Sequence, residues 1–387
     1  MNLRSRLIES LKRLDSGLGR VAVPLLAGAP RPLPAAPDDA LVVRLWGLGN
    51  LALMAPRLAP WPGRRLRLLT FARQRAFVQR HLPQIEALYL PEPCSPGFLP
   101  ALAQALWRLH RDPPQVVIDA ETFLSSPALL VRCATPAPLV GMDTPGQHRG
   151  PLLDRKLSYD PTRHVAVTFA ALFDAAGLPA APGAKPLRRD PERQSQLAAR
   201  LGLNGPGPLV LLHPGSGDHF PGRRWDPSRF AELARALRRG GARVGITGAA
   251  CERPRTRAVA QAAGPGVLDL GGCVDAGGLS DLLGLARLLV TNDTGPLHLA
   301  DALAVPVVGL FGPNTPHRYG PRGPRAIALF ADLPCSPCLD DRLAKRSRCR
   351  DPRCMSALRV RDVLAACQTA LRSRSATPLE AALALPR

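Results

Sequence analysis

At positions 291–298 the sequence is Thr291-Asn292-Asp293-Thr294-Gly295-Pro296-Leu297-His298. An apolar run at 288–291 ends here and a helical pattern follows at 296–304, which predicts a buried strand that turns directly into a helix. The free N–H groups and positive dipole end of that helix suit a diphosphate, and Thr294 and Gly295 permit close approach of its oxygens. The alternatives are that Asp293 is only an N-cap and that His298 is only a structural histidine.

The alternation of strand and helix continues outward from this stretch in both directions. Strand patterns lie at 41–45, 67–70, 116–119, 139–141, 209–212, 243–247, 267–270, 288–291 and 305–310. Segments long enough for helices separate them, so the sequence predicts an α/β protein with two Rossmann-like halves, each built on a parallel sheet. Ligands bind such sheets at the carboxyl ends of the strands, and the loops that follow the strands are therefore the candidate sites.

Proline-rich and glycine-rich segments divide the chain. An amphipathic cationic helix is expected at 3–18, either packed on its own domain or in contact with an anionic lipid surface, and a proline-rich linker follows it. A second segment rich in Pro, Gly and charge lies at 179–208. The predicted divisions are 1–38 (helix and linker), 39–185 (first Rossmann-like domain), 205–355 (second Rossmann-like domain) and 356–387 (C-terminal helix and tail).

Composition limits the classes of function. The 387 residues are 46% hydrophobic and carry a formal net charge of +21, so the chain can form full cores and its partners are expected to be anionic. Nine scattered cysteines favour reduced thiols in the cytoplasm over a disulfide framework. No run of 18 apolar residues occurs, and only 4% of the residues are aromatic. Nucleic-acid binding would rest on charge alone, because no recognised nucleic-acid motif accompanies it.

Two further loops contain candidate binding residues. His213 to Gly217 follow the strand pattern at 209–212, and Arg223 lies close enough for a surface loop to fold back over them. Arginine can neutralise the charge on a departing pyrophosphate without a metal, although a bare arginine pair is often only a solvated surface feature. Glu252 follows the strand at 243–247 and can hold ribose hydroxyls, as acidic residues do in dinucleotide folds.

Together these loops resemble the C-terminal domain of glycosyltransferase family 9, the bacterial lipopolysaccharide heptosyltransferases and their relatives. Residues 293–300 and 309–316 are similar to the nucleotide-diphosphate signature and the downstream loop of that family, and the resemblance extends over roughly 40–370. It implies a GT-B fold of two facing Rossmann-like domains, with the donor bound by the second and the acceptor by the first. It also implies inverting transfer from a nucleotide-diphosphate sugar without metal or cofactor, and a final helix at 360–373 that packs back across the first domain.

The resemblance also assigns roles to individual residues. Arg223 would face the leaving pyrophosphate, Glu252 the ribose, and Gly49 and Asn50 the acceptor. The residues that would hold the donor phosphates are Ser216, Asp293, Thr294, Gly295 and His298.

Two positions depart from the pattern of the family. Arg223 stands where members usually have Lys, which keeps the charge but alters its geometry. Asn50 stands where they usually have the Asp taken to be the general base, and an amide cannot accept the proton of the acceptor hydroxyl. Four other groups follow strands of the first domain and could replace it, namely Asp119, Glu121, Asp143 and His148.

A cysteine cluster forms a separate candidate site. Cys335, Cys338, Cys349 and Cys354 have a spacing compatible with tetrahedral zinc, and the alternative is a reduced structural loop. We assign no metal ligands, because the family is not known for a metal requirement. The cluster lies in a basic segment, 318–361, with eleven Arg or Lys against four Asp, which would attract an anionic lipid-linked glycan or a lipid surface.

The sequence therefore predicts a heptosyltransferase that moves heptose from ADP-heptose to a lipopolysaccharide-core or related membrane-linked glycan. It would work in the cytoplasm, in peripheral contact with the inner face of the inner membrane. The alternative, suggested by Asn50, is a homologue that binds nucleotide-sugar or glycan but does not transfer. Binding of nucleic acid is not expected.

Overall fold

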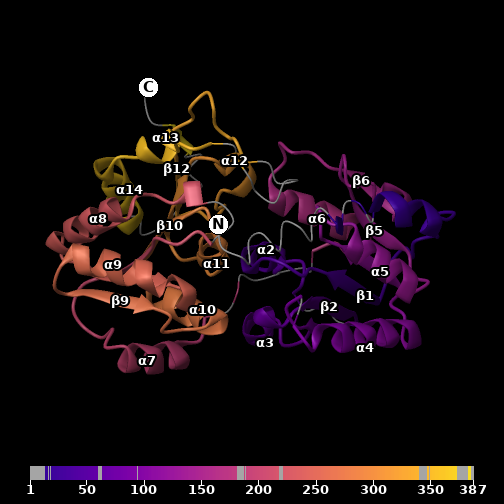
Figure 1. Ribbon diagram of the computed structural model, residues 1–387. Helices are drawn as coiled ribbons and strands as arrows, with labels where there is room; N and C mark the ends of the chain where they lie inside the picture. Colours follow the sequence, from indigo (N-terminus) through magenta and orange to yellow (C-terminus); the bar gives the residue numbers. More distant parts are fainter. Residues whose placement is uncertain are drawn as a thin grey trace. The chain divides into compact units, whose positions relative to one another are not determined.

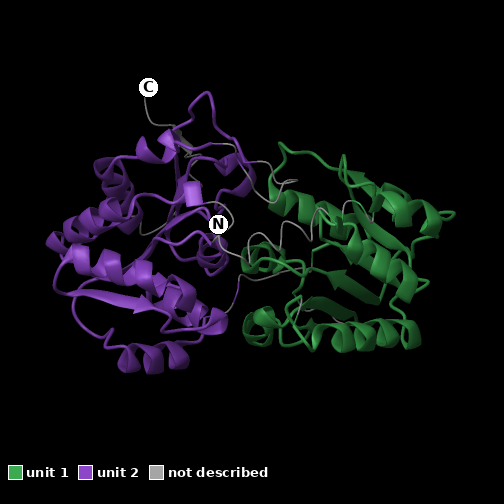
Figure 2. Ribbon diagram, in the orientation of Figure 1, with its two compact units in different colours: residues 1–185 green, residues 186–387 purple. Residues whose placement is uncertain are grey.

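The computed structural model describes residues 14, 15, 17, 19–59, 63–93, 95–180, 187, 189–217, 221–339, 347, 349–372 and 382–384. The chain forms two compact units, residues 1–185 and 186–387 (Figure 2). Each unit contains one sheet in which every strand pair is parallel, with helices between successive strands (Figure 1). This confirms the predicted α/β fold with two Rossmann-like halves.

The sheet of the first unit has the strand order β3-β2-β1-β4-β5-β6. Residues of β1 pair with β2 on one side and with β4 on the other, so the order reverses at β1. The described elements are β1 (Asp39–Val43), α2 (Leu48–Met54), β2 (Arg65–Phe71), η1 (Ala72–Gln74), α3 (Arg75–His81), β3 (Glu86–Leu90), α4 (Phe98–Arg111), β4 (Val116–Asp119), α5 (Ser126–Ala134), β5 (Leu139–Asp143), η2 (Gly150–Leu152), β6 (Arg155–Ser158) and α6 (Val165–Ala175).

The sheet of the second unit has the order β13-β12-β11-β10-β7-β8-β9. Every residue of its three central strands β7, β10 and β11 is buried, as expected for a parallel sheet covered on both faces. The described elements are α7 (Pro191–Arg200), β7 (Leu209–His213), η3 (Pro221–Arg223), α8 (Pro227–Arg239), β8 (Arg243–Gly248), η4 (Ala250–Glu252), α9 (Arg253–Ala263), β9 (Val267–Gly271), α10 (Ala276–Leu285), β10 (Leu288–Asn292), α11 (Gly295–Ala302), β11 (Val307–Phe311), α12 (Pro316–Tyr319), β12 (Ala326–Phe330), α13 (Arg353–Ser356), α14 (Val360–Arg372) and β13 (Ala382–Ala384).

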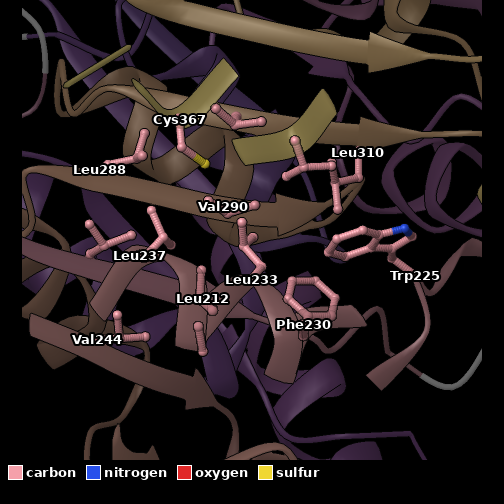
Figure 3. Close-up of a cluster of buried hydrophobic side chains, with 14 of the residues drawn as sticks. Leu212, Trp225, Phe230, Leu233, Leu237, Val244, Leu288, Val290, Leu310 and Cys367 are labelled. Carbon is pink, nitrogen blue, oxygen red and sulfur yellow. The ribbon is translucent and has the colours of Figure 1, made fainter. Parts of the chain in front are cut away.

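The core of the second unit packs around the fully buried indole of Trp225, which Figure 3 shows beside Phe230 and Leu310. The indole meets the ring of Phe230 edge to face, with 5.0 Å between ring centroids, and its Nε1 donates to the carbonyl of Leu358 at 2.9 Å. Its polar atom is thus satisfied while its large apolar surface is buried. The backbone that carries Arg223 is therefore anchored two residues away, in the core.

The final helix α14 packs on the core of its own unit. The buried face of α14 includes Val363, Ala366 and Cys367, and all three belong to the core of the second unit. The helix also contacts α8 and the strands β10, β11 and β12. An apolar stripe wide enough to cover the sheet of its own unit accounts for this packing.

The predicted N-terminal helix falls largely outside the described residues, and the helical part that is described continues to residue 26, beyond the predicted end at 18. Asp15 in this segment accepts hydrogen bonds from the backbone N–H groups of Ser125 and Ser126, both at 2.7 Å. These groups begin α5, so the carboxylate caps a helix more than 100 residues away. With Val23 in the core of the first unit, the described part packs on its own unit.

Candidate functional site

The junction of β10 and α11 has the form that the sequence predicts. Thr294 precedes the first residue of α11 and its side chain makes no capping hydrogen bond, while Pro296 brings no N–H group to the first turn. The positive end of the helix is therefore not neutralised by its own N-cap side chain. Asp293 is buried, and its Oδ2 accepts a 2.8 Å hydrogen bond from Nδ2 of Asn314, in the loop after β11. His298 is buried one turn into the helix.

Asn292, the last residue of β10, connects the loops around this helix end. Its Oδ1 accepts from the backbone N–H of Trp225 at 2.9 Å, and its Nδ2 donates to the carbonyls of Pro214 and Gly215 at 3.1 and 3.0 Å. Its side chain is fully buried, so each of these bonds is costly to lose. The prediction gave Asn292 no role, although an amide at the end of an otherwise apolar strand was a visible signal.

Arg223 is buried and fixed by the same loops. Nη1 donates to the carbonyl of Asp293 at 3.0 Å and lies 3.7 Å from its carboxylate, while Nη2 donates to the carbonyl of Ser216 at 2.6 Å. Within the described residues, its buried Nε has no hydrogen-bond partner. The alternative of a solvated surface arginine is therefore wrong, because this guanidinium joins the loop after β7 to the loop after β10.

Arg224 holds the other side of the β7 loop. Its Nε donates to Oγ of Ser216 at 3.0 Å and its Nη2 to the carbonyl of Gly217 at 2.6 Å. Two successive arginines thus bind the same short loop, one buried and the other more exposed. Arg224 was not among the predicted site residues, since nothing in the sequence distinguishes its role from that of its neighbour.

Glu252 lies against the β7 loop from the side of β8. Its Oε2 accepts from the backbone N–H of Ala249 at 3.0 Å and lies 3.8 Å from Nε2 of His213. A Cβ at Gly215 would come within 2.0 Å of Oε1, so only glycine permits this approach. Burial lowers the pKa of His213, with Glu252 acting in the opposite direction. The imidazole is therefore neutral at physiological pH.

Four of the predicted donor residues and Arg223, predicted to face the leaving pyrophosphate, thus lie close together in the loops at one edge of the second sheet. These are Ser216, Arg223, Asp293, Thr294 and Gly295. Glu252 belongs to the same edge through its contact with Gly215, and His298 through α11. Each predicted residue follows a strand that ends at this edge.

Gly49 and Asn50 lie in the first unit, in the first turn of α2. Gly47 begins the turn with φ of +90°, and a Cβ there would lie 2.9 Å from Nδ2 of Asn50. The backbone N–H of Asn50 donates to the carbonyl of Gly47 at 3.0 Å. The helix α2 begins at Leu48 and therefore includes both residues.

Two of the four alternative bases are committed to structural contacts. Arg149 is fully buried and forms an ion pair with Asp119, whose pKa burial raises to about 6 despite this partner. Glu121 accepts from the backbone N–H groups of Leu45 and Trp46 at 2.7 and 3.0 Å. Glu121 thus supports the chain between β1 and the glycine turn, while Asp119 also accepts from the backbone N–H of Glu121 at 2.9 Å.

The other two alternatives differ in their partners. His148 is exposed, and its Nε2 accepts a 3.3 Å hydrogen bond from Arg20 of the N-terminal segment. Asp143 ends β5 and is half-buried, and its carboxylate packs over Gly150, where a Cβ would come within 2.6 Å of Oδ1. Within the described residues no hydrogen bond or ion pair reaches this carboxylate.

The cysteine cluster lies beside the loop after β11. The backbone N–H of Cys338 donates to the carbonyl of Pro313 at 2.9 Å, and a Cβ at Gly312 would lie 2.9 Å from Sγ of Cys354. Burial raises the pKa of the Cys354 thiol to about 11, and the three other cysteines of the cluster raise it as well. Among the described residues no group of three or more potential ligands is arranged to hold a metal ion, so the zinc alternative has no supporting geometry.

The fold and these loops define a class of protein, that of the GT-B fold. The solved E. coli ADP-heptose lps heptosyltransferase II superposes with a TM-score of 0.68 at 20% identity, over 86% of this chain and 98% of that one. The E. coli heptosyltransferase WaaC with ADP gives 0.64 at 18% identity, over 86% and 99% of the two chains. At this level of identity the likeness shows the fold.

The family follows from the sequence comparisons. The model of glycosyltransferase family 9 (heptosyltransferase) matches residues 103–346. Lipopolysaccharide heptosyltransferase 1 of Pseudomonas aeruginosa is 33% identical over 292 residues, which are 72% of this chain and 76% of that protein. The chain belongs to glycosyltransferase family 9, as its loops after β7, β8 and β10 predict.

Proposed function

We propose that this protein is an inverting glycosyltransferase that moves heptose from ADP-heptose to a phosphorylated, lipid-linked glycan of the lipopolysaccharide core. The observation that carries the proposal is the joining of the loop after β7 to the end of β10, at the N-terminus of α11, by Asn292 and Arg223. The names of the relatives support heptose as the sugar, and the E. coli structure with ADP supports adenine as the base.

In this proposal the second unit stabilises the leaving group. The N-terminal N–H groups of α11 and the guanidinium of Arg223 provide fixed positive charge for the diphosphate, and Glu252 holds the ribose hydroxyls. Because these groups are held by buried contacts before the substrate arrives, little reorganisation accompanies the growth of charge on the leaving oxygen. Such a site needs no metal ion to neutralise the pyrophosphate.

We assign the general base to Asp143. Asn50 cannot accept a proton, Asp119 and Glu121 hold the backbone, and His148 is bonded to Arg20. Asp143 is at the same edge of the sheet as the glycine turn, two strands from β1, or about 10 Å at the usual strand spacing. That separation suits an acceptor sugar that Asn50 orients and Asp143 deprotonates.

We further propose that the enzyme works on the cytoplasmic side of the inner membrane, in peripheral contact with it. Of the described residues, no helix is long and apolar enough to cross a bilayer. The basic segment 318–361 and the net charge of +21 would attract a phosphorylated glycolipid acceptor.

Calorimetric titration with ADP, UDP and GDP tests the donor assignment, because each is the product fragment of one donor class. Saturable binding of ADP alone supports the proposal, whereas preference for UDP or GDP changes the donor. If none of the three binds, the donor site is misassigned.

Asn50 also motivates a second candidate, a protein that binds the donor without transferring its sugar. Release of ADP from ADP-heptose, measured with a lipopolysaccharide-core acceptor, separates the two functions. A protein that binds ADP tightly but shows no acceptor-dependent release would be the non-transferring homologue.

A further inference from the structure

The opposite edge of the second sheet carries a concavity of about 310 Å³ lined by four arginines. Arg243 begins β8, Arg287 and Arg325 immediately precede β10 and β12, and Arg189 immediately precedes the helix-capping Asp190 of α7. We call Arg189, Arg243, Arg287 and Arg325 the arginine pocket. It is separated from the donor loops by the length of the strands, because those loops follow the carboxyl ends and these residues lie at the amino ends.

Backbone carbonyls hold the guanidinium groups in place. Nε and Nη2 of Arg189 donate to the carbonyl of Leu303 at 3.0 and 2.8 Å, and Nη2 of Arg325 donates to that of Ala304 at 2.8 Å. Both carbonyls lie at the C-terminal end of α11, so this pair caps the helix. Each arginine still has N–H donors left, since a guanidinium carries five.

The other two arginines are anchored in a similar way. Nε of Arg243 donates to the carbonyl of Gly207 at 3.1 Å, and Nη2 of Arg287 lies 3.4 Å from that of Leu371, in the last turn of α14. A cradle of this kind loses little side-chain entropy when it binds a ligand.

The charge of the pocket is not balanced within the protein. Among the described residues, none of the four arginines forms an ion pair with a carboxylate. Arg325 lies close enough to Arg189 to lower its pKa, an effect that adds to the larger one of burial. Positive charges gathered without a counter-charge attract an anion, and planar guanidinium groups match the paired oxygens of phosphate.

We propose that the arginine pocket binds a phosphate-bearing anion at a second site, distinct from the donor site. The ligand chemistry is a diphosphate or closely spaced phosphates, since four guanidinium groups exceed what one phosphate needs. The source is either a soluble phosphate compound or the head group of a phospholipid. This inference does not depend on the identity of the sugar or on the catalytic base.

The first test uses inorganic pyrophosphate and the full-length wild-type protein. Phenylglyoxal modifies accessible arginines, and peptide mass spectrometry gives the extent of modification at each one. We expect pyrophosphate to protect Arg189 and Arg325 at least about fivefold, while exposed Arg239 and Arg257, which are outside the pocket, stay equally reactive. Unchanged modification of the pocket arginines at saturating pyrophosphate would overturn the proposal.

The second test compares two variants of equal charge. Arg189→Gln/Arg325→Gln removes half of the pocket, and Arg239→Gln/Arg257→Gln removes two exposed arginines elsewhere. In calorimetry we expect the arginine pocket of this variant to bind pyrophosphate at least about tenfold more weakly, since a charge-assisted hydrogen bond is worth at least that much. The control should bind as the wild type does, and equal isotherms for the two variants would refute the second site.

Vesicles identify the source of the phosphate. If phosphatidic acid in phosphatidylcholine vesicles recruits the wild type and the control but not the pocket variant, the site binds lipid head groups. If pyrophosphate binding depends on the pocket while vesicle binding does not, the ligand is a soluble phosphate. The Gln substitutions also remove the hydrogen bonds that cap α11. Arg189→Lys/Arg325→Lys therefore serves as a milder variant, which should retain intermediate affinity for pyrophosphate.

Discussion

The carboxyl edges of the two sheets use their polar residues in different ways. In the second unit, Asn292 and Arg223 join strand-end loops and leave the N-terminus of α11 without a side-chain cap. In the first unit, Asp119 forms an ion pair with Arg149, and Glu121 accepts hydrogen bonds from the backbone. The carboxyl edge of the second sheet is thus built around fixed positive charge, whereas at that of the first sheet the carboxylate of Asp143 lies outside any such network among the described residues.

In the proposed function, this difference assigns the two halves of the reaction to different kinds of residue. Leaving-group stabilisation requires charges held in place before binding, and buried hydrogen bonds achieve this. Proton removal requires a carboxylate that can exchange its proton, which a buried ion pair such as Asp119–Arg149 hinders. The predictions below test this division, beginning with the largest effect.

Asp143→Asn should lower kcat at least about a hundredfold, because general-base catalysis contributes roughly a hundred- to ten-thousand-fold. The affinity for ADP should not change, since Asp143 belongs to the first unit. Acceptor-dependent ADP release and calorimetry measure the two quantities. The matched control is Asp160→Asn, a half-buried carboxylate of the same unit whose Oδ1 accepts hydrogen bonds from nearby Thr162. A kcat within a factor of three of the wild type would place the base elsewhere.

Asn292→Ala should lower the free energy of unfolding by about 3 kcal/mol, because the N–H of Trp225 and two carbonyls lose their buried partner. Urea denaturation of the protein, followed by tryptophan fluorescence, to which the buried Trp225 contributes, measures the change in the free energy of unfolding. Asn314→Ala, which removes the bond to Asp293 and one local bond from the N–H of Thr315, should cost less, about 1 to 2 kcal/mol. Equal losses for the two variants would show that Asn292 does not connect the loops.

The sequence predicts the central strands of the second sheet well, because 209–212 and 288–290 are continuous apolar runs buried on both faces, and 244–247 is buried throughout. It does not predict β3, β6 or β12. The first two are edge strands: β6 has no buried residue, and in β3 only Leu88 and Leu90 are buried, which is a weaker signal than a continuous buried run.

Site residues are predictable where they follow a strand within a few positions, as Glu252 and Asp293 do. The sequence does not predict that Arg223 is buried or that Asp119 forms a structural ion pair, because both depend on partners far along the chain. The arginine pocket is also undetectable in the sequence, since its four residues span positions 189 to 325 and meet only when the amino ends of the strands align.

The stability of the first unit should depend on pH through His81. Burial lowers the pKa of His81 to about 4, and its ring nitrogens have no partner among the described residues. Between about pH 6.5 and pH 4 the unfolded chain binds this proton and the folded chain does not, so stability falls as the pH falls through that window. His81→Phe should remove this part of the pH dependence of thermal unfolding.

The control for His81 is His110→Phe, which changes an exposed histidine of the same unit. It should leave the pH dependence as in the wild type. If both variants lose stability equally between pH 6.5 and pH 4, the acid sensitivity arises from other groups.

The smallest expected effect belongs to Asn50→Asp, which restores the residue usual in the family. If Asp143 is the base, a second carboxylate in the glycine turn adds little, and kcat should change by less than about threefold. The turn itself should persist, because Asn50 holds it through its backbone N–H to Gly47, which Asp retains. A rise in kcat of a hundredfold would return the base to this position and make Asp143 a residue that only contacts the acceptor. Measuring Asn50→Asp in the Asp143→Asn background sharpens the test. Recovery of kcat in the double variant would show that a carboxylate at either position can take the proton, whereas no recovery would leave Asp143 of β5 as the general base.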